Sequence, residues 1–190
     1  GTELCAIVEQ MYSYSHLFAA TGDGKWAERL EGLAFNALPA TISDDMWTHQ
    51  YDQQTNQIRC ARLPEDHVVF GTNSAESHLF GLEPNFGCCT ANFNQGWPKF
   101  ALSAFMHSEG EVISVVPVPS AVETEDFSVE LETLYPFENK LEYTVKAECE
   151  MTLKVRVPSF AKNLKVNGTP STARAELDFT VAAGSTELIT

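Results

Sequence analysis

The sequence has few basic residues and no long apolar run. Twelve Lys and Arg side chains stand against 26 Asp and Glu, which gives a formal net charge of −14 at pH 7, and the basic residues form no cluster. A surface of this charge repels phosphate groups, which disfavours nucleic acids and anionic membranes as partners. No apolar stretch approaches the roughly 20 residues of a membrane-spanning helix. A neutral ligand such as a sugar is compatible with this composition.

The chain also lacks an initiator methionine and a signal peptide. It begins at Gly1 and ends in Glu-Leu-Ile-Thr, which has the pattern of a strand. We therefore expect a piece of a longer protein, whose missing targeting signals leave its location undefined. The sequence leaves the oligomeric state open as well. Its 190 residues suffice for one large or two small domains with a sizeable core.

A disulfide framework is not indicated either, because five cysteines are an odd number with irregular spacing. The most informative feature is the doublet Cys88-Cys89. Adjacent cysteines pair poorly with each other, because the peptide between them strains the disulfide. Together with Glu3 and Cys5, the doublet supplies one carboxylate and three thiolates, a sufficient set for tetrahedral zinc. The alternative is a chance doublet or two small buried apolar side chains.

The sequence pattern changes near Gly110, which predicts an α+β chain with helices first and strands after. Apolar stripes at helical spacing predict three helices: 5–20, 25–38 and 98–107, the last with Pro98 in its first turn. The stretch 41–89 is loop-rich and aromatic, which favours a functional role.

Strict alternation of apolar and polar residues over 141–157 predicts strands with one buried face. Because this run exceeds a usual strand length, we expect a hairpin that turns near 147–150. Further strands are predicted at 112–116, 127–134, 164–166 and 177–181, with turns at Asn167-Gly168 and Gly184. This half is expected to form an antiparallel β-sandwich or a large part of one.

Glu3 and Cys5 would point about 200° apart on a regular helix. They can share a metal only if Glu3 precedes the helix and Cys5 lies in its first turn, and we expect the doublet likewise to precede its own helix. Helix N-termini favour thiolates. The metal would then act as a staple between helices, or a metal-bound thiolate would attack an electrophilic carbon.

A catalytic thiolate needs a general acid to protonate the leaving group. The candidates are four carboxylates in the loop before the doublet: Glu65, Asp66, Glu76 and Glu83. His49, His67 and His78 are candidates for another role, as hydrogen-bond donors in a sugar site. For each, a solvated or structural side chain is the alternative interpretation. Cys60 and Cys149 are interpreted as free thiols.

The motifs resemble glycoside hydrolase family 127 and its relatives, a group long catalogued as a domain of unknown function. Glu3-Leu4-Cys5 opening a helix and the later Cys88-Cys89 carry the likeness in the helical half. Three segments look like the family's sandwich domain: 134–138 (Leu-Tyr-Pro-Phe-Glu), 155–161 (Val-Arg-Val-Pro-Ser-Phe-Ala) and the segment ending at Asn167-Gly168. The Thr-Ala-Asn after the doublet and the Gln-Gly-Trp-Pro that follows indicate a divergent branch.

The resemblance implies that residues 1–109 form the C-terminal portion of an (α/α)6 barrel. Residues 110–190 would then form a β-sandwich that is truncated at its end. It also implies a carbohydrate substrate, namely L-arabinofuranosyl or related linkages in plant-type glycans, cleaved with retention of configuration. The family's zinc ligands map onto Glu3, Cys5, Cys88 and Cys89. Cys88 maps onto the nucleophile, which forms a thioglycosyl intermediate. This mechanism differs from that of most glycosidases, which use two carboxylates.

The resemblance also matches Tyr51, in Trp-Thr-His-Gln-Tyr, to a pocket tyrosine, and His49 beside it is a second candidate for substrate binding. The family's acid/base glutamate lies upstream of the Glu-x-Cys motif, so we expect it outside this sequence, together with the first half of the barrel. The piece alone is therefore expected to be inactive. A non-catalytic carbohydrate-binding protein with structural zinc, and a metal-free fold with inert thiols, are the competing hypotheses.

Overall fold

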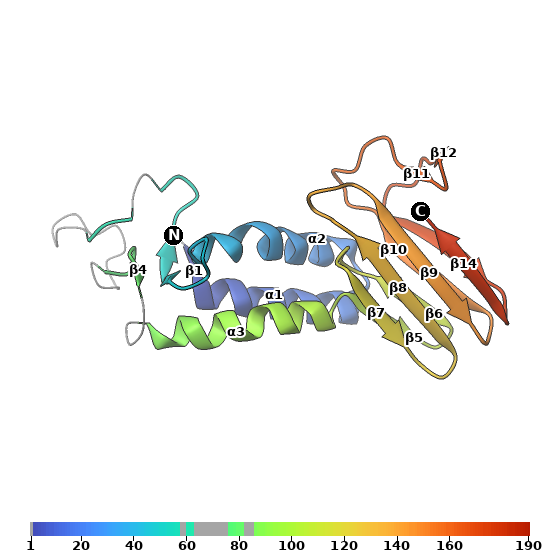
Figure 1. The fold of residues 1–190 in the computed structure, drawn as a ribbon, viewed down its shortest axis with the longest axis horizontal. Coiled ribbons are helices and arrows are strands. Elements are labelled where there is room, and N and C mark those ends of the chain that lie inside the picture. The colour runs from blue at the N-terminus through green and yellow to red at the C-terminus, as the bar shows by residue number, and fades with distance from the viewer. Residues whose placement is uncertain (1, 58–59, 63–75, 82–85) are drawn as a thin grey trace. The chain divides into compact units, whose positions relative to one another are not determined.

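The structure, a computed structural model, describes residues 2–57, 60–62, 76–81 and 86–190 (Figure 1). Three α-helices are present in these residues: α1 (Leu4–Thr21), α2 (Gly24–Gly32) and α3 (Gly87–Leu102). A π-helical turn, η1 (Leu33–Ala37), and a 3-10 turn, η2 (Pro39–Thr41), follow α2. No described helix combines the length and apolar character needed to cross a bilayer.

The strands divide into short loop strands and longer sheet strands. Two-residue strands are β1 (Thr2–Glu3), β2 (His49–Gln50), β3 (Asp52–Gln53), β4 (Phe80–Gly81), β11 (Lys165–Val166) and β12 (Thr169–Pro170). The sheet strands are β5 (Phe105–Ser108), β6 (Glu111–Ser114), β7 (Ser120–Glu123), β8 (Phe127–Thr133), β9 (Leu141–Ala147), β10 (Met151–Arg156), β13 (Glu176–Val181) and β14 (Ser185–Ile189). The predicted α+β class is therefore confirmed.

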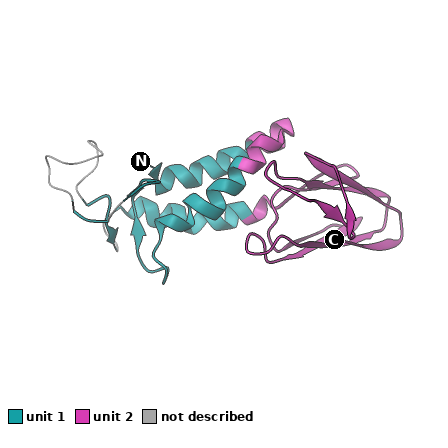
Figure 2. Ribbon diagram, turned by 90° about the horizontal axis from the view of Figure 1, so that it is seen from above, with its two compact units in different colours: residues 1–16, 29–100 teal, residues 17–28, 101–190 magenta. Residues whose placement is uncertain are grey.

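The chain forms two compact units, coloured separately in Figure 2. One contains residues 1–16 and 29–100, and the other contains residues 17–28 and 101–190. The first carries β1 to β4 and most of α1 and α3, and the second carries the two larger sheets. Each unit is described by itself below.

α1 agrees with the prediction of a helix over 5–20. Its buried residues Leu4, Ile7, Val8 and Met11 recur at the spacing of one helical face. The helix ends where Gly22 adopts a positive φ of 65° and donates its N–H to the Phe18 carbonyl at 2.8 Å. A left-handed glycine at this position is a common helix terminator.

The predicted helix over 98–107 is wrong at both ends. α3 begins at Gly87, Pro98 lies inside it, and residues 105–108 form β5. The doublet consequently lies in the first turn of α3 and not in the loop before it. Gly96 lies inside the helix, although glycine is a poor helix former. A Cβ at this position would meet the Val8 and Leu38 side chains at 3.1 and 3.2 Å. Close tertiary packing thus selects a residue with poor helix propensity.

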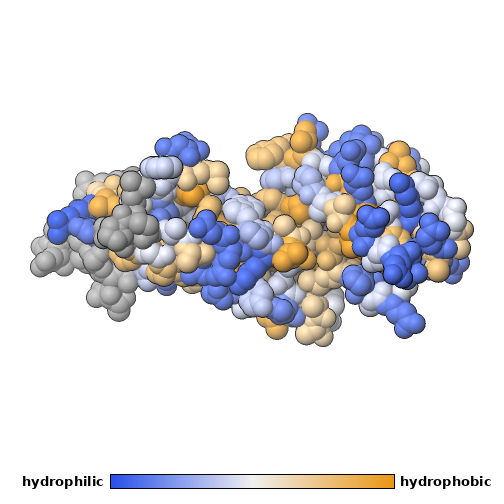
Figure 3. Space-filling view, turned by 60° about the horizontal axis from the view of Figure 1, so that its bottom comes forward, coloured by the Kyte–Doolittle hydropathy of each residue, from blue (hydrophilic) through white to orange (hydrophobic). Residues whose placement is uncertain are grey.

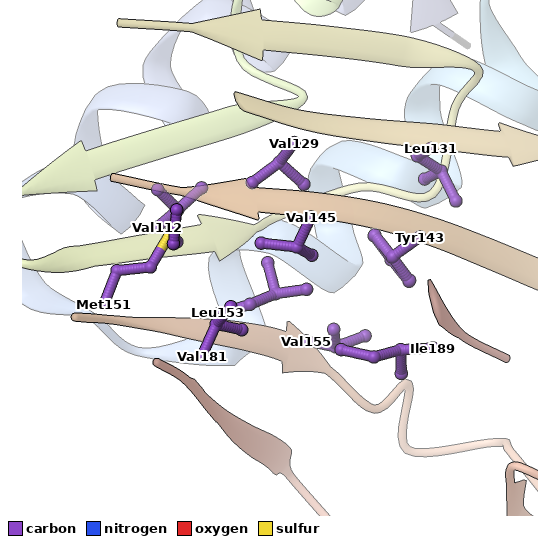
Figure 4. Packing of buried hydrophobic residues seen from close by; sticks show 11 residues of the cluster. Val112, Val129, Leu131, Tyr143, Val145, Met151, Leu153, Val155, Val181 and Ile189 are labelled. Atoms are coloured by element: carbon purple, nitrogen blue, oxygen red, sulfur yellow. The ribbon is translucent and has the colours of Figure 1, made fainter. Parts of the chain in front are cut away.

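Two four-stranded sheets, in the orders β13-β10-β6-β5 and β14-β9-β8-β7, share one apolar core (Figure 4). The core residues are Val112, Val129, Leu131, Tyr143, Val145, Ala147, Met151, Leu153, Val155, Val181 and Ile189. They come from both sheets at alternate positions, as the period of two predicts. Figure 3 shows many hydrophilic side chains on the outward-facing surface of this unit.

The expected hairpin within 141–157 is wrong, although the break falls where it was predicted. β9 pairs with β8 and β14, whereas β10 pairs with β6 and β13. The turn at 148–150 therefore carries the chain from one sheet to the other. Alternation fits both arrangements equally, because in each the odd-numbered residues face the core.

One strand pair also departs from the predicted antiparallel arrangement. β6 and β10 run parallel, with Val112 opposite Leu153. A parallel pair needs a long connection, and here the residues between them include β7, β8 and β9 of the other sheet. The turns at Asn167-Gly168 and Gly184 are confirmed, and all three residues have positive φ.

Glu28 on α2 joins this helix to the segment after β10. Its carboxylate accepts hydrogen bonds from the Ser159 hydroxyl at 2.6 Å and the Ser159 backbone N–H at 3.1 Å. The hydroxyl bond, followed by the backbone bond, holds the pKa of Glu28 below its usual value of 4.5. The ionised carboxylate therefore stabilises the folded state.

Replacing Leu153 by Ala should lower the free energy of unfolding by about 2–5 kcal/mol, because the side chain is fully buried between the sheets. The matched control is Leu134→Ala, since Leu134 is 63% exposed and should change stability by no more than about 0.5 kcal/mol. Urea denaturation measures both. Equal losses would contradict the assignment of Leu153 to the core.

Glu28→Gln should destabilise the protein at neutral pH and lose its effect in acid. A carboxyl with a lowered pKa in the folded state contributes stability above its unfolded-state pKa, and that contribution disappears as pH falls through the folded-state value. The stability difference between wild type and variant should therefore be constant above about pH 5 and shrink below about pH 4. Thermal unfolding at a series of pH values tests this, and a difference independent of pH would refute it.

Candidate metal centre

α1 and α3 lie side by side and run in the same direction (Figure 1). Residues near the start of α1 contact residues near the start of α3, and later residues contact later ones. The pairs are Cys5 with Cys89, Val8 with Gly96, Glu9 with Gln95, and Tyr12 with Lys99. Both N-termini therefore lie at the same end of the pair. The positive ends of two helix dipoles thus lie next to the cysteines of the first turns.

The start of α1 is attached to the loop strands. β1 pairs with β3, with Glu3 opposite Asp52, and the Leu4 N–H donates to the Tyr51 carbonyl at 3.0 Å. Glu3 therefore precedes the helix and Cys5 lies in its first turn, as predicted. This pairing brings Tyr51 to the N-terminus of α1.

The sulfur atoms of Cys5, Cys88 and Cys89 all lie within 4.8 Å of one another. The Cys5 and Cys89 sulfurs are 3.8 Å apart, too far for a disulfide, and all five cysteines are free. Two thiolates that bind one zinc tetrahedrally at about 2.3 Å are themselves about 3.8 Å apart. The spacing and chemistry of this thiol cluster therefore fit a thiophilic metal ion.

The three thiols differ in exposure. Cys89 is completely buried, Cys5 is half-buried and Cys88 is exposed. Burial, followed by a hydrogen bond with Cys88, raises the pKa of Cys5 to about 11, and burial followed by the charge of Cys5 raises the pKa of Cys89 strongly. Neighbouring thiols oppose one another's ionisation, and a bound cation reverses this effect.

Tyr51 and Glu3 form a second part of the site. Burial raises the pKa of Tyr51 to about 12, followed by its hydrogen bond to Glu3 and by the charges of Glu3, Asp52 and Cys88. The hydroxyl therefore donates to the Glu3 carboxylate near Cys88. The Tyr51 ring packs on Phe86, with the centroids 4.3 Å apart. Among the described residues, the group of mutually close ligand atoms consists of the three thiols, and the Glu3 carboxylate lies outside it.

The other candidate residues lie elsewhere or outside the described residues. His49 is in β2 opposite Gly81 of β4, His78 is buried with its carbonyl bonded to Gln50, and Glu76 lies 3.9 Å from Arg62. Glu65, Asp66, His67 and Glu83 lie outside the described residues. Cys60 and Cys149 are exposed and free, as predicted.

Sequence reasoning missed Asn92, which lies at the thiol cluster. Its side-chain N–H donates to the Cys88 carbonyl at 3.0 Å, and its amide also hydrogen-bonds to Cys5. The signal that could have found it is its spacing from Cys88, because residues four apart share a helix face.

Comparison with protein-family models matches residues 1–102 to the β-L-arabinofuranosidase GH127 catalytic domain and residues 114–183 to the GH127 middle domain. The first match alone covers more than half of the chain. The chain belongs to the GH127 family. No curated protein sequence matches it significantly.

Solved structures agree with the fold of this GH127 chain. A GH127 β-L-arabinofuranosidase from Geobacillus stearothermophilus T6 is similar with a TM-score of 0.70 at 18% identity, over 98% of this chain and 31% of that one. A GH127 β-arabinofuranosidase gives 0.65 at 18% identity over the same shares, and a structure described as a glycoside hydrolase gives 0.69 at 19%. The chain thus spans about a third of the length of these structures.

Cys89→Ser should weaken metal binding by more than about tenfold, because it removes a completely buried thiol of the cluster. Cys149→Ser is the matched control, since Cys149 lies at the turn after β9, in the other compact unit. Competition with a chromophoric chelator measures the affinity, and elemental analysis measures the stoichiometry. Equal affinities in the two variants would refute the cluster as a metal site.

Proposed function

We propose that the protein containing this chain is a retaining glycoside hydrolase that cleaves L-arabinofuranosyl or related linkages. In this proposal zinc is held by Glu3, Cys5, Cys88 and Cys89, and Cys88 is the nucleophile. Membership of GH127 and the fold of the similar arabinofuranosidases support the reaction class. The observation that carries the assignment is the exposed Cys88 thiol beside the buried Cys89 and the half-buried Cys5.

The doublet supplies two thiols with separate roles in this proposal. A nucleophile must be reachable by the anomeric carbon, which suits the exposed Cys88, whereas the buried Cys89 suits a ligand only. Bound zinc would keep the thiols deprotonated at neutral pH. The two helix N-termini also favour negative charge at these sulfurs.

In the reaction, the Cys88 sulfur forms a bond to the anomeric carbon while the bond to the leaving oxygen breaks. A carboxyl upstream of Glu3, outside this sequence, donates the proton that the leaving oxygen needs. Water then attacks the same carbon from the face opposite the Cys88 sulfur and gives one proton to the carboxylate that protonated the leaving oxygen. The bond between the carbon and the sulfur breaks, which releases the Cys88 thiolate and a sugar of retained configuration. Tyr51 holds the Glu3 carboxylate in place through its hydroxyl.

Tyr51 and His49 are proposed as substrate-binding residues. The nearness of Tyr51 to Glu3 and Cys88 supports its role, and that of His49 follows from its place two residues earlier in the same segment. We further propose residues 1–109 as the end of an (α/α)6 barrel and residues 110–190 as a β-sandwich, in agreement with the two family matches and the shared core of the two sheets.

A carbohydrate-binding protein with structural zinc is the second candidate. A set of four protein ligands without an open position is typical of structural zinc, and this favours the alternative. The two candidates differ in whether Cys88 is needed for turnover or only for metal retention.

Cys88→Ser in the full-length protein should lower turnover of a chromogenic β-L-arabinofuranoside at least about a thousandfold, because a hydroxyl replaces the reactive thiolate. Cys149→Ser should leave turnover unchanged, since Cys149 lies in the other compact unit. Mass spectrometry of the wild type, quenched in acid during turnover, should find a pentosyl adduct on the peptide containing Cys88. Full activity of Cys88→Ser would overturn the mechanism, and sugar binding without turnover by the wild type would favour the binding protein.

A further inference from the structure

A short loop presents two large apolar side chains on the surface. Residues 43–48 connect Ile42 to His49, and these two residues form an antiparallel bridge. Within the loop, Trp47 is 72% exposed and its neighbour Met46 is 62% exposed. Large apolar side chains that lie together in solvent commonly mark a place where a ligand binds.

Hydrogen bonds hold this loop in one conformation. The Ser43 N–H donates to the Thr48 carbonyl at 2.8 Å, and the Thr48 N–H donates to the Ser43 hydroxyl at 2.9 Å. The Asp45 carboxylate accepts from the Ser43 hydroxyl at 2.7 Å and from the Trp47 N–H at 3.1 Å. Met46 has a φ of 60°, which a residue with a Cβ rarely adopts. Such strain persists where surrounding contacts impose it, and it is concentrated at functional sites.

The chain that follows Trp47 leads toward the thiol cluster. Gln50 and Asp52 are buried, whereas His49 and Tyr51 are half-buried and Trp47 is exposed. Because side chains alternate along an extended chain, Trp47, His49 and Tyr51 share the outer side of this segment. At about 3.3 Å per residue, the backbone positions of Trp47 and Tyr51 are at most about 13 Å apart.

Tyr51 connects this segment to the start of α3. Its carbonyl accepts the Leu4 N–H at 3.0 Å, and its ring packs on Phe86 with the centroids 4.3 Å apart. Phe86 precedes Cys88 by two residues, and its carbonyl accepts the Cys89 N–H at 2.9 Å. A row of aromatic side chains thus begins beside the thiols and ends at an exposed indole. This aromatic row consists of Phe86, Tyr51, His49 and Trp47, all in one compact unit.

We propose that Trp47 stacks on a sugar unit remote from the bond that is cleaved, so that the substrate is an oligosaccharide or a glycan chain. A sugar ring has a face of C–H groups, which packs well on the electron-rich face of an indole. Binding sites for such ligands are lined by aromatic side chains with a few polar groups among them. The inference rests on the proposed function and deepens it by naming the substrate class.

The test uses the full-length protein and two substrates, methyl β-L-arabinofuranoside and a β-L-arabinofuranosyl trisaccharide. Trp47→Ala removes the stacking face, Trp47→Leu keeps an apolar side chain, Trp47→Tyr keeps an aromatic face, and Asp45→Ala releases the Trp47 N–H. Phe137→Ala is the matched control, because Phe137 is 92% exposed in the other compact unit. Steady-state kinetics gives kcat and KM, and calorimetry gives the Kd of the trisaccharide in the Cys88→Ser background.

Trp47→Ala should lower kcat/KM for the trisaccharide about tenfold more than kcat/KM for the methyl glycoside. The additional loss should appear in KM, because the stacking contact is the same in the ground state and the transition state. The Kd of the trisaccharide should rise by a similar factor. Trp47→Leu should behave like Trp47→Ala, and Trp47→Tyr should retain most of the selectivity. Asp45→Ala should lose part of the selectivity, with no further loss in the Trp47→Ala background. Phe137→Ala should match the wild type.

Equal losses for the two substrates in Trp47→Ala, or a loss of thermal stability without a change in selectivity, would refute the role of Trp47. If Trp47→Ala does not fold, the comparison of Trp47→Leu with Trp47→Tyr decides, and equal selectivity in these two would refute it. If the wild type cleaves neither substrate, the proposed reaction fails and the Kd values alone decide about Trp47. A wild type that neither cleaves nor binds the trisaccharide would overturn both.

Discussion

The parallel packing of α1 and α3 is the constraint on which the site depends. Gly96 permits it, because a Cβ there would press on Val8 and Leu38 at 3.1 and 3.2 Å. With the two helices in this register, their first turns lie together and bring Cys5 to 3.8 Å from Cys89. A shift of one helical turn would move the sulfurs about 5.4 Å along the axis and separate the thiol cluster.

The same packing explains why the thiols, the amides and the loop strands form one arrangement. Gln95 and Asn92 lie on the face of α3 that meets α1, so their hydrogen bonds reach Glu9 and Cys5 on the neighbouring helix. Next to the N-termini of the two helices, β1 pairs with β3 and brings Tyr51 to Glu3. The proposed zinc chemistry thus rests on residues from three separate parts of the sequence. The two larger sheets form their own core in the other compact unit.

Much of the fold could be predicted, and the errors have a common origin. The helical stripe of α1 and the alternation over 141–157 were interpreted correctly, since each depends on which face of one element is apolar. Which strands pair with each other was not predictable in the same way. β9 and β10 present the same pattern whether they form a hairpin or cross between sheets, and the parallel partner of β10 lies far back in the chain at β6. The start of α3 was misplaced because Gly96 and Pro98 are poor helix residues, and the close packing that selects Gly96 involves Val8 and Leu38, which lie far away in the sequence.

In the site, the candidate ligands and the family could be predicted from the sequence, because the doublet, the Glu-x-Cys motif and the sandwich segments are local patterns. The expectation that Glu3 precedes the helix and that Cys5 lies in its first turn was also correct. Three features of the site became apparent only in the folded chain: the three thiols meet, Cys88 is exposed while Cys89 is buried, and Asn92 donates to the Cys88 carbonyl. The physical reason is that exposure and hydrogen-bond direction belong to contacts between distant segments, whereas a motif records only the neighbours along the chain.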